Sequence, residues 1–448
     1  AREHMVTIYG ENSVMLCRLY NQMANAYYYM TQFKFAREYY QKSLDIVQNT
    51  LGRNNMYCIE PLMGLGNVCI SEDATGQQIH KAKQYLTRAS FISASVYGAD
   101  NPNTTLIDSQ IGDLSLLQGD LRDAYTKYMK QSMSLVDVLG EYADTHQSMA
   151  TSHLNIGMYY IAKANEATYQ MDSVLVCQYA EQALEEFELS ENICESIYGK
   201  DNPSVVSVLQ GKAQAYLLLS QPEAAIEQYK HAADITFKHY GYDSPLAAQA
   251  YATLASVCKY EGDREGPDGK EKLEDARDYF LKAISMRQRN PGNDKEMIIT
   301  STADWRVYLA STYMSLKDYD DALKMMDGVI WDLEQMQLDS KFGLYNCYYT
   351  KSNMIFQCEG DYEEAHELLK KAESLLPELV YNNKQAEDFQ KYQLSFAFAV
   401  LNERMNKIDD ALKYYEESLD AIRKYAKEPT VRDIVMNIEQ KIESLRSL

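Results

Sequence analysis

Several features that mark other classes of protein are scarce or missing in this sequence. Only nine of its 448 residues are proline and twenty are glycine, which argues against large disordered regions. No apolar run reaches the roughly 18 residues that a membrane-spanning helix needs, and the N-terminal stretch lacks the apolar core of a signal peptide. We therefore predict a cytoplasmic protein without membrane association.

Motifs that carry chemistry are also missing. The eight cysteines form no C-x-x-C pair and have no histidine-rich segment beside them, so neither a zinc framework nor a redox motif is present. Phosphate-binding, metalloprotease, nucleophile-elbow and EF-hand motifs do not occur. Gly64 and Gly66 lie within a helical pattern with no preceding strand, which we interpret as close helix packing. We predict no catalytic residue, no cofactor, no metal and no enzyme activity.

Positive charge is in short supply. Lys and Arg number 44 against 65 Asp and Glu, which gives a net charge of −21. No Lys/Arg block is long enough to follow a phosphate backbone, so we predict no binding to nucleic acid. The same charge would favour basic partners, although on a long rod it also serves solubility alone.

The sequence does contain a repeating pattern along its whole length. An alanine is followed four residues later by a large apolar or aromatic residue and seven residues later by a small one, positions that share one face of a helix. The clear copies begin at Ala36, Ala82, Ala225, Ala276, Ala365 and Ala411, with weaker ones at Ala124 and Ala322. The small positions allow a neighbouring helix to approach closely while the large side chain fills the gap.

A second pattern lies upstream of most copies. A small residue is followed three positions later by a ring or a similar filler, as in Ala24/Tyr27, Gly157/Tyr160 and Ala213/Tyr216. Turn signals separate the two patterns at Gly119-Asp120, Lys317-Asp318 and Gly360-Asp361. Each copy therefore predicts a helix, a tight turn and a second helix.

This helix pair resembles the tetratricopeptide repeat, with its small/Tyr first helix and Ala/aromatic/Ala second helix. The resemblance implies an all-α, right-handed superhelical solenoid of about nine repeats over residues 1–428, closed by a C-terminal capping helix at 429–448. The repeats are expected near residues 13–50, 55–97, 103–139, 144–198, 203–240, 245–289, 297–335, 340–377 and 385–425.

Most successive alanines of the second helix are roughly 42 to 52 residues apart, more than the usual 34 or so of this repeat. The added length is a recurring connection, Tyr97-Gly-Ala-Asp-Asn-Pro102 and its counterparts at 198–203 and 240–245. Glycine should end one helix, and Asn or Ser followed by Pro should start the next. This variant is similar to the long repeats of kinesin light chains.

Three copies contain insertions between their helices, at Ser71 to His80, Ala162 to Ser173 and Glu261 to Glu274. The last contains Glu-Gly-Asp-Arg-Glu-Gly-Pro-Asp-Gly, which we predict to be an exposed irregular loop. After Pro429, residues Ile434, Ile438, Ile442 and Leu445 share a face of the predicted capping helix.

The resemblance also implies a binding surface. In related families, polar residues of the first helices line a groove and hydrogen-bond the backbone of a bound peptide, for which asparagine suits because its amide both donates and accepts. The corresponding residues here are Asn21, Gln22, Asn25, Gln110, Asn155 and Gln214. The same amides could instead bridge neighbouring first helices.

Three functions are compatible with these observations. The first is a scaffold or adaptor that binds a peptide or partner protein on the concave face. The second is a permanent subunit of a large multi-subunit ciliary or cytoskeletal assembly, held by large interfaces. The third is the regulatory region of a larger enzyme or motor, since the sequence begins at Ala1 rather than at a methionine.

Overall fold

The computed structural model describes residues 2–10, 13–72, 76–289, 295–336, 341–379, 381 and 384–447. Within these ranges the chain is almost entirely helical and contains no strand. It divides into two compact units, Ala1–Leu254 and Ala255–Leu448, whose boundary falls inside helix α12 (Pro245–Glu265). The predicted all-α fold class is confirmed.

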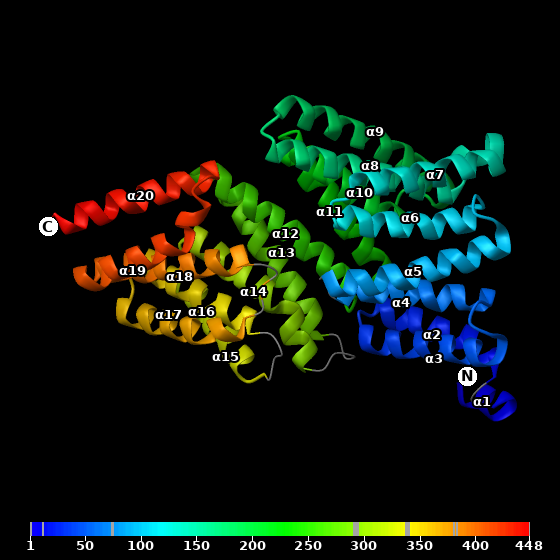
Figure 1. Cartoon of the computed structure of the whole chain (residues 1–448), viewed down its shortest axis with the longest axis horizontal. Helices are drawn as coiled ribbons and strands as arrows, with labels where there is room; N and C mark the ends of the chain where they lie inside the picture. The colour runs from blue at the N-terminus through cyan, green and yellow to red at the C-terminus, as the bar shows by residue number, and fades with distance from the viewer. Residues whose placement is uncertain are drawn as a thin grey trace. The chain divides into compact units, whose positions relative to one another are not determined.

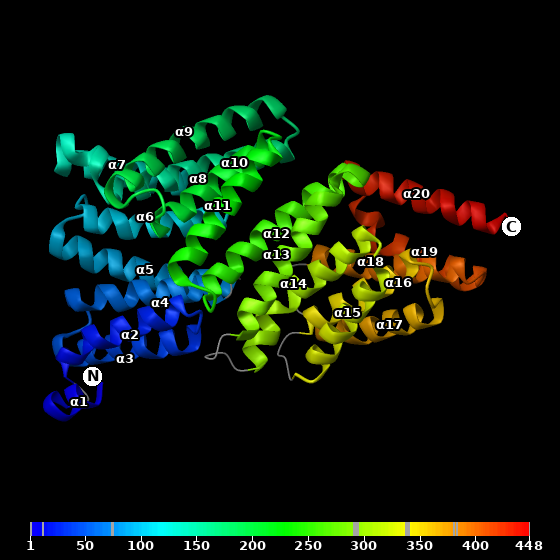
Figure 2. The same cartoon turned by 180° about the vertical axis from the view of Figure 1, so that it is seen from behind.

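The first unit consists of antiparallel helix pairs, of which the first four lie one above the other in both views (Figure 1, Figure 2). In each pair we call the first helix A and the second helix B. The unit contains α1 (Arg2–Tyr9), then the pairs α2 (Cys17–Tyr29) with α3 (Phe33–Leu51), α4 (Ile59–Glu72) with α5 (Gly76–Tyr97), α6 (Pro102–Leu117) with α7 (Leu121–Leu139), α8 (Gln147–Tyr169) with α9 (Ser173–Tyr198), and α10 (Val206–Leu218) with α11 (Pro222–Tyr240).

The second unit continues the same alternation. Helix α12 is followed by α13 (Lys270–Arg289), α14 (Lys295–Leu316) with α15 (Tyr319–Glu334), α16 (Phe342–Gln357) with α17 (Tyr362–Leu375), α18 (Lys384–Arg404) with α19 (Ile408–Ile422), and the single helix α20 (Pro429–Arg446). The short 3-10 helices are η1 (Val14–Leu16), η2 (Met56–Cys58), η3 (Gly140–Thr145), η4 (Pro203–Val205), η5 (Gly266–Gly269), η6 (Leu376–Glu378) and η7 (Arg423–Tyr425). The described residues thus hold nine consecutive A and B pairs between α1 and α20, as the repeat pattern predicts.

The A helices form one side of each stack. Besides its own B helix, α2 contacts α4, α6 contacts α8, α8 contacts α10, and α16 contacts α18. Residues of successive A helices can therefore meet at one site.

Glycines on the A helices receive large side chains from the B helices. A β-carbon on Gly64 would lie 2.3 Å from the ring of Tyr40, and one on Gly66 would lie 3.0 Å from Leu86. Real β-carbons do not come as close as the contact at Gly64, so a side chain there would require Tyr40 to shift, whereas at Gly66 a small shift of Leu86 would be needed. The interpretation of this glycine pair as close helix packing is confirmed.

The turns between A and B helices share one geometry in seven of the pairs. A residue in the left-handed conformation ends the A helix, and the next N–H donates to the carbonyl five residues before it. After Gly119, for example, the Asp120 N–H donates to the Ser115 carbonyl at 2.8 Å. In the predicted Gly360-Asp361 turn the left-handed residue is Glu359, one position earlier.

The connection from α5 to α6 has the predicted caps. Gly98 follows α5 with a φ of +100°. The Asn101 side chain accepts a hydrogen bond from the Asn103 N–H at 3.0 Å, and Pro102 is the first residue of α6. The glycine end and the Asn-Pro start are therefore confirmed here.

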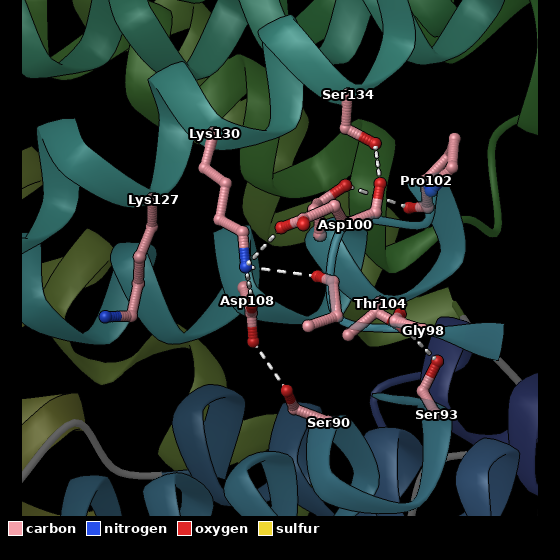
Figure 3. A network of polar contacts seen from close by, with 12 residues as sticks. Ser90, Ser93, Gly98, Asp100, Pro102, Thr104, Asp108, Lys127, Lys130 and Ser134 are labelled. Atoms are coloured by element: carbon pink, nitrogen blue, oxygen red, sulfur yellow. Dashed lines mark hydrogen bonds and ion pairs between the residues drawn. The ribbon is translucent and has the colours of Figure 1, made fainter. Parts of the chain in front are cut away.

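The following B helix holds this connection in place (Figure 3). Lys130 on α7 donates to the Ala99 carbonyl at 3.0 Å, and its Nζ lies 3.7 Å from the Asp108 carboxylate. Ser134, one turn further on, donates to the Asp100 carbonyl at 2.6 Å. The added length of this repeat is therefore fixed structure rather than a slack loop.

The prediction of an exposed irregular loop at Glu261 to Glu274 is correct in exposure for residues 263, 264 and 266–268 but wrong in conformation, because the segment is helical. Its first residues complete α12, a single 3-10 turn covers 266–269, and its last residues start α13. Gly262 and Gly269 pack backbone to backbone, because a β-carbon on Gly269 would lie 2.1 Å from the Gly262 carbonyl oxygen. The glycines serve close packing here, and the ion pair of Lys272 with Glu265, at 2.5 Å, bridges the turn.

The other two insertions also contribute to helices. Residues of the Ala162 to Ser173 insertion extend α8 to Tyr169 and begin α9. Of the Ser71 to His80 insertion, 71–72 end α4 and 76–80 begin α5, while 73–75 lie outside the described residues.

Helix α20 covers the last pair. It packs against α19, and its buried face consists of Val431, Val435, Ile438, Ile442 and Leu445, with Ile434 at the edge. The predicted capping helix is confirmed, with two valines added to its apolar face.

Candidate peptide-binding site

A cavity of about 440 Å³ opens on the A helices of the first three pairs. We call it the amide pocket, because four asparagine side chains line it. Its lining comprises Cys17, Asn21, Asn25, Tyr40, Met56, Tyr57, Ile59, Glu60, Met63, Gly64, Asn67, Ser93, Tyr97, Asn103, Leu106 and Ile107. The walls are thus apolar, with amides placed between thioether, aliphatic and aromatic groups.

The helical period explains why these residues meet. Asn21 and Asn25 are four residues apart on α2 and share a face, as do Met63 and Asn67 on α4. Contact between α2 and α4 sets these faces side by side, and α6 adds Asn103 from its first turn. Three successive repeats therefore build one site.

Asn25 is oriented by a tyrosine from its own B helix. The Tyr40 hydroxyl donates to Asn25 Oδ1, which leaves the Asn25 NH₂ group as a donor toward the pocket. Burial, with a smaller contribution from Glu60, raises the pKa of Tyr40 to about 12. Tyr40 therefore remains protonated at neutral pH and keeps this orientation.

Asn21 has a hydrogen-bond acceptor without a partner. Its side chain is only 3% exposed, and its Oδ1 is buried without a hydrogen-bond partner. A buried acceptor without a partner is unfavourable, by about 1–3 kcal/mol. Asn21 lines the pocket, so a rotation of its side chain that turned Oδ1 toward an N–H donor of a bound molecule would remove this penalty.

Charge in the pocket is limited to one group. Glu60, on the first turn of α4, is the only Asp, Glu, Lys or Arg among the lining residues. Its side chain is exposed and makes no ion pair with the described residues. The pocket is therefore weakly acidic and contains no cation for an anionic ligand.

The other predicted residues are spread along the stack. Gln22 is exposed on α2, and Gln110 is half-buried on α6 with Oε1 lacking a partner. Asn155 is half-buried on α8, and Gln214 is half-buried on α10. The structure thus brings Asn21 and Asn25 together in the pocket, whereas Gln22, Gln110, Asn155 and Gln214 are not among its lining residues.

Two pocket residues were missed by the sequence patterns. Asn67 follows Gly66 just as Asn25 follows Ala24, so the first-helix register could have found it. Asn103 follows the Asn-Pro cap of α6, and no signal in the repeat marks it as part of a binding surface.

The site has little capacity for covalent chemistry. Burial raises the pKa of the Cys17 thiol, so this lining cysteine stays protonated and weakly nucleophilic. The described residues contain no group of three or more His, Cys, Asp or Glu placed to hold a metal ion. None of the described helices is long and apolar enough to cross a membrane.

Comparisons with known proteins agree with the repeat. The family model for the tetratricopeptide repeat matches residues 15–76 and 178–236. A search of curated protein sequences gives no match.

Solved structures of repeat proteins are similar at low identity. BtubC (BKLC) from P. vanneervenii shares 16% identity with a TM-score of 0.44, over 58% of this chain and 93% of that chain. A structure described by its TPR-like repeats and as a kinesin light chain of Podosopora anserina shares 15% identity with a TM-score of 0.39, over 51% and 96%. A Rap protein complexed with Competence and Sporulation Factor shares 14% with a TM-score of 0.43, over 97% and 100%.

Side chains of the B helices pack on glycines of the A helices, and the family model matches the chain at two places. Both findings agree with the repeat that the sequence pattern predicts. Residues 15–76 and 178–236 of this chain are thus similar to the tetratricopeptide repeat.

Proposed function

We propose that this protein is a scaffold that binds an extended segment of a partner protein in the amide pocket. The tetratricopeptide repeat is in general a protein-interaction module without catalysis, which supports a scaffold role in the broad sense. The observation that carries the choice of site is the buried, unpaired Oδ1 of Asn21 beside the donor group of Asn25.

An extended peptide backbone matches this arrangement. Its N–H groups and carbonyls alternate along the chain, so one N–H can donate to Asn21 Oδ1 while a nearby carbonyl accepts from Asn25. The apolar walls around Met63 and Leu106 would take a side chain of the same segment. The amides supply affinity that tolerates many sequences, and the walls supply selectivity.

Glu60 adds a preference for bound segments that carry positive charge. A Lys or Arg on the bound segment would find an unpaired carboxylate there, whereas an acidic segment would meet Glu60 and the net charge of −21. We therefore expect segments that combine an apolar residue with a cation, which is consistent with the basic partners that composition favours.

The test uses affinity capture from the source lysate with a photo-crosslinking amino acid at Met63. The full chain is compared with Asn21→Ala/Asn67→Ala and with a control, Asn192→Ala, which removes an exposed asparagine on α9 outside the pocket. Because Asn21 Oδ1 has no internal partner, the pocket variant should retain its helicity. We expect it to lose crosslinked proteins that wild type and control both capture.

The second candidate function makes the opposite prediction. If the pocket variant captures the same multi-subunit set as wild type and Met63 yields no crosslink, the chain is an assembly component that uses other faces. In that case the peptide proposal fails. Loss of partners restricted to the pocket variant would support it, and Glu60→Gln should then weaken binding of segments that contain Lys or Arg.

A further inference from the structure

Helix α5 differs in charge from the rest of this acidic chain. Its 22 residues include Lys81, Lys83 and Arg88 but no Asp or Glu. Residues 1–130 contain twelve Lys or Arg and twelve Asp or Glu, so the whole net charge of −21 belongs to residues 131–448. Helix α5 itself therefore carries no negative charge that would repel an anion.

One face of α5 forms a shallow depression of about 490 Å³. The residues that line it are His80, Lys83, Gln84, Thr87, Arg88 and Phe91. Their spacing of three and four residues places them on a single helical stripe, about 16 Å long. The described lining contains no carboxylate, so the stripe combines cations with amide, hydroxyl and aromatic groups.

The groups on this stripe are available for contact. Phe91 is 61% exposed. Lys83 and Arg88 are half-buried. Lys83 makes no ion pair within 4 Å with the described residues, although Asp123 lies within its electrostatic reach. Arg88 donates one hydrogen bond, from Nη2 to the Arg53 carbonyl at 2.6 Å, which leaves other guanidinium donors. An exposed ring next to two cations, on a helix with no acidic residue, offers an apolar contact and a cationic contact side by side.

We infer that the α5 stripe, residues 80–91, docks an acidic helical segment of a partner protein. Carboxylates of that segment pair with Lys83 and Arg88, and an apolar side chain packs on Phe91. Three cations are too few to follow a nucleic-acid backbone against a net charge of −21, and the exposed ring requires an apolar partner group. This surface lies on a B helix and does not depend on the amide pocket.

The test measures fluorescence anisotropy of labelled helical peptides of about 18 residues added to the full chain. One peptide carries Glu and Leu on one face, a second has Gln in place of each Glu, and a third has Lys. A single-stranded DNA oligonucleotide is the fourth probe. We expect the Glu peptide to bind at least about tenfold more tightly than the Gln peptide, with the difference lost when NaCl is raised from about 50 to 500 mM.

Three variants locate the binding. Lys83→Glu/Arg88→Glu should weaken the Glu peptide at least about tenfold and improve the Lys peptide. Phe91→Ala, which removes an exposed ring and spares the fold, should weaken the Glu and Gln peptides alike. Lys413→Glu/Lys427→Glu makes the same change in net charge on the second unit and should leave binding unchanged.

Several results would overturn the inference. These are equal binding of the Glu and Gln peptides, equal loss in the Lys413→Glu/Lys427→Glu control, and binding of the DNA that depends on Lys83 while the Glu peptide does not bind. If thermal melting shows that Lys83→Glu/Arg88→Glu is unfolded, the Phe91→Ala variant tests the inference instead. An unchanged affinity of Phe91→Ala for the Glu peptide would contradict the docking geometry.

Discussion

On two A helices, the residue that follows the small position accepts a hydrogen bond from a tyrosine. Asn25 accepts from Tyr40, and Asp113 accepts from Tyr128 at 2.7 Å. In both cases the tyrosine belongs to the B helix of the same pair. A hydroxyl buried between helices needs such a partner, so the two positions are linked chemically.

Asp113 differs from Asn25 because it is ionisable, and burying its charged form is unfavourable at neutral pH. Burial raises its pKa from the ordinary 3.8 to about 6, although the hydrogen bond from Tyr128 favours the ionised form. Because the folded pKa lies above the unfolded one, the protonated form is favoured in the fold. The contribution to stability is therefore complete below about pH 4 and is lost as pH rises through about 6.

Asp113→Asn should accordingly stabilise the protein at pH 7. The amide oxygen can still accept from Tyr128, but no charge is buried, and we expect a gain of up to about 2 kcal/mol. Urea unfolding followed by circular dichroism from pH 4 to 7 measures it. The gain should vanish toward pH 4, and a gain that is constant over this range would contradict the assignment to Asp113.

The same pairing explains what the sequence could reveal about the site. Asn21 and Asn25 were predicted because they occupy A-helix positions that the resemblance marks. Asn67 has the register of Asn25, but the residue of its own B helix that corresponds to Tyr40 is Leu86, which has no hydroxyl. The Asn67 amide is therefore available to line the pocket. This role can be recognised only when the two helices of the pair are compared in three dimensions.

At the scale of helices, close approach is set by glycine. Phe187 on α9 lies between Gly157 of its own A helix and Gly211 of the next one. A β-carbon on either glycine would lie 2.5 Å from the Phe187 ring. The ring thus joins three helices through contacts that only glycine permits.

Gly157→Ala should destabilise the protein by about 1–3 kcal/mol, because a close-packed core absorbs an added methyl poorly. Gly343→Ala is the matched control, since nothing lies within 4 Å of the new β-carbon on α16, and it should be neutral or stabilising by up to about 1 kcal/mol. Thermal melting monitored by circular dichroism compares the two. Adding Phe187→Leu to Gly157→Ala should recover part of the loss, and strict additivity of the two changes would argue against the contact.

Helix pairs were predictable because their patterns recur, whereas the connections depend on single contacts. The segment 261–274 has the composition of a loop, yet Gly262 and Gly269 support backbone packing and the ion pair of Glu265 with Lys272 bridges the turn. Composition cannot separate a glycine that loosens a chain from one that lets two segments touch. The sequence therefore predicted the helix pairs correctly but not the helical conformation of this connection.

At the scale of the whole molecule, charge is unevenly distributed along the stack. Residues 131–254 contain five Lys or Arg and sixteen Asp or Glu, whereas residues 1–130 are balanced. Helix α9 alone carries six glutamates. The α8 to α11 part of the first unit is thus under self-repulsion that the α2 to α6 part lacks.

Added salt should therefore stabilise the two parts of this unit unequally. Raising NaCl from about 20 to about 300 mM shortens the screening length to well below the spacing of successive repeats and weakens repulsion among exposed carboxylates. The Lys212–Glu191 pair is half-buried and is screened less. We expect amide hydrogen exchange in α8 to α11 to slow by the equivalent of about 0.5 kcal/mol or more, with little change in α2 to α6. KCl at equal ionic strength should act alike, and equal slowing of both parts would show that self-repulsion does not limit this region.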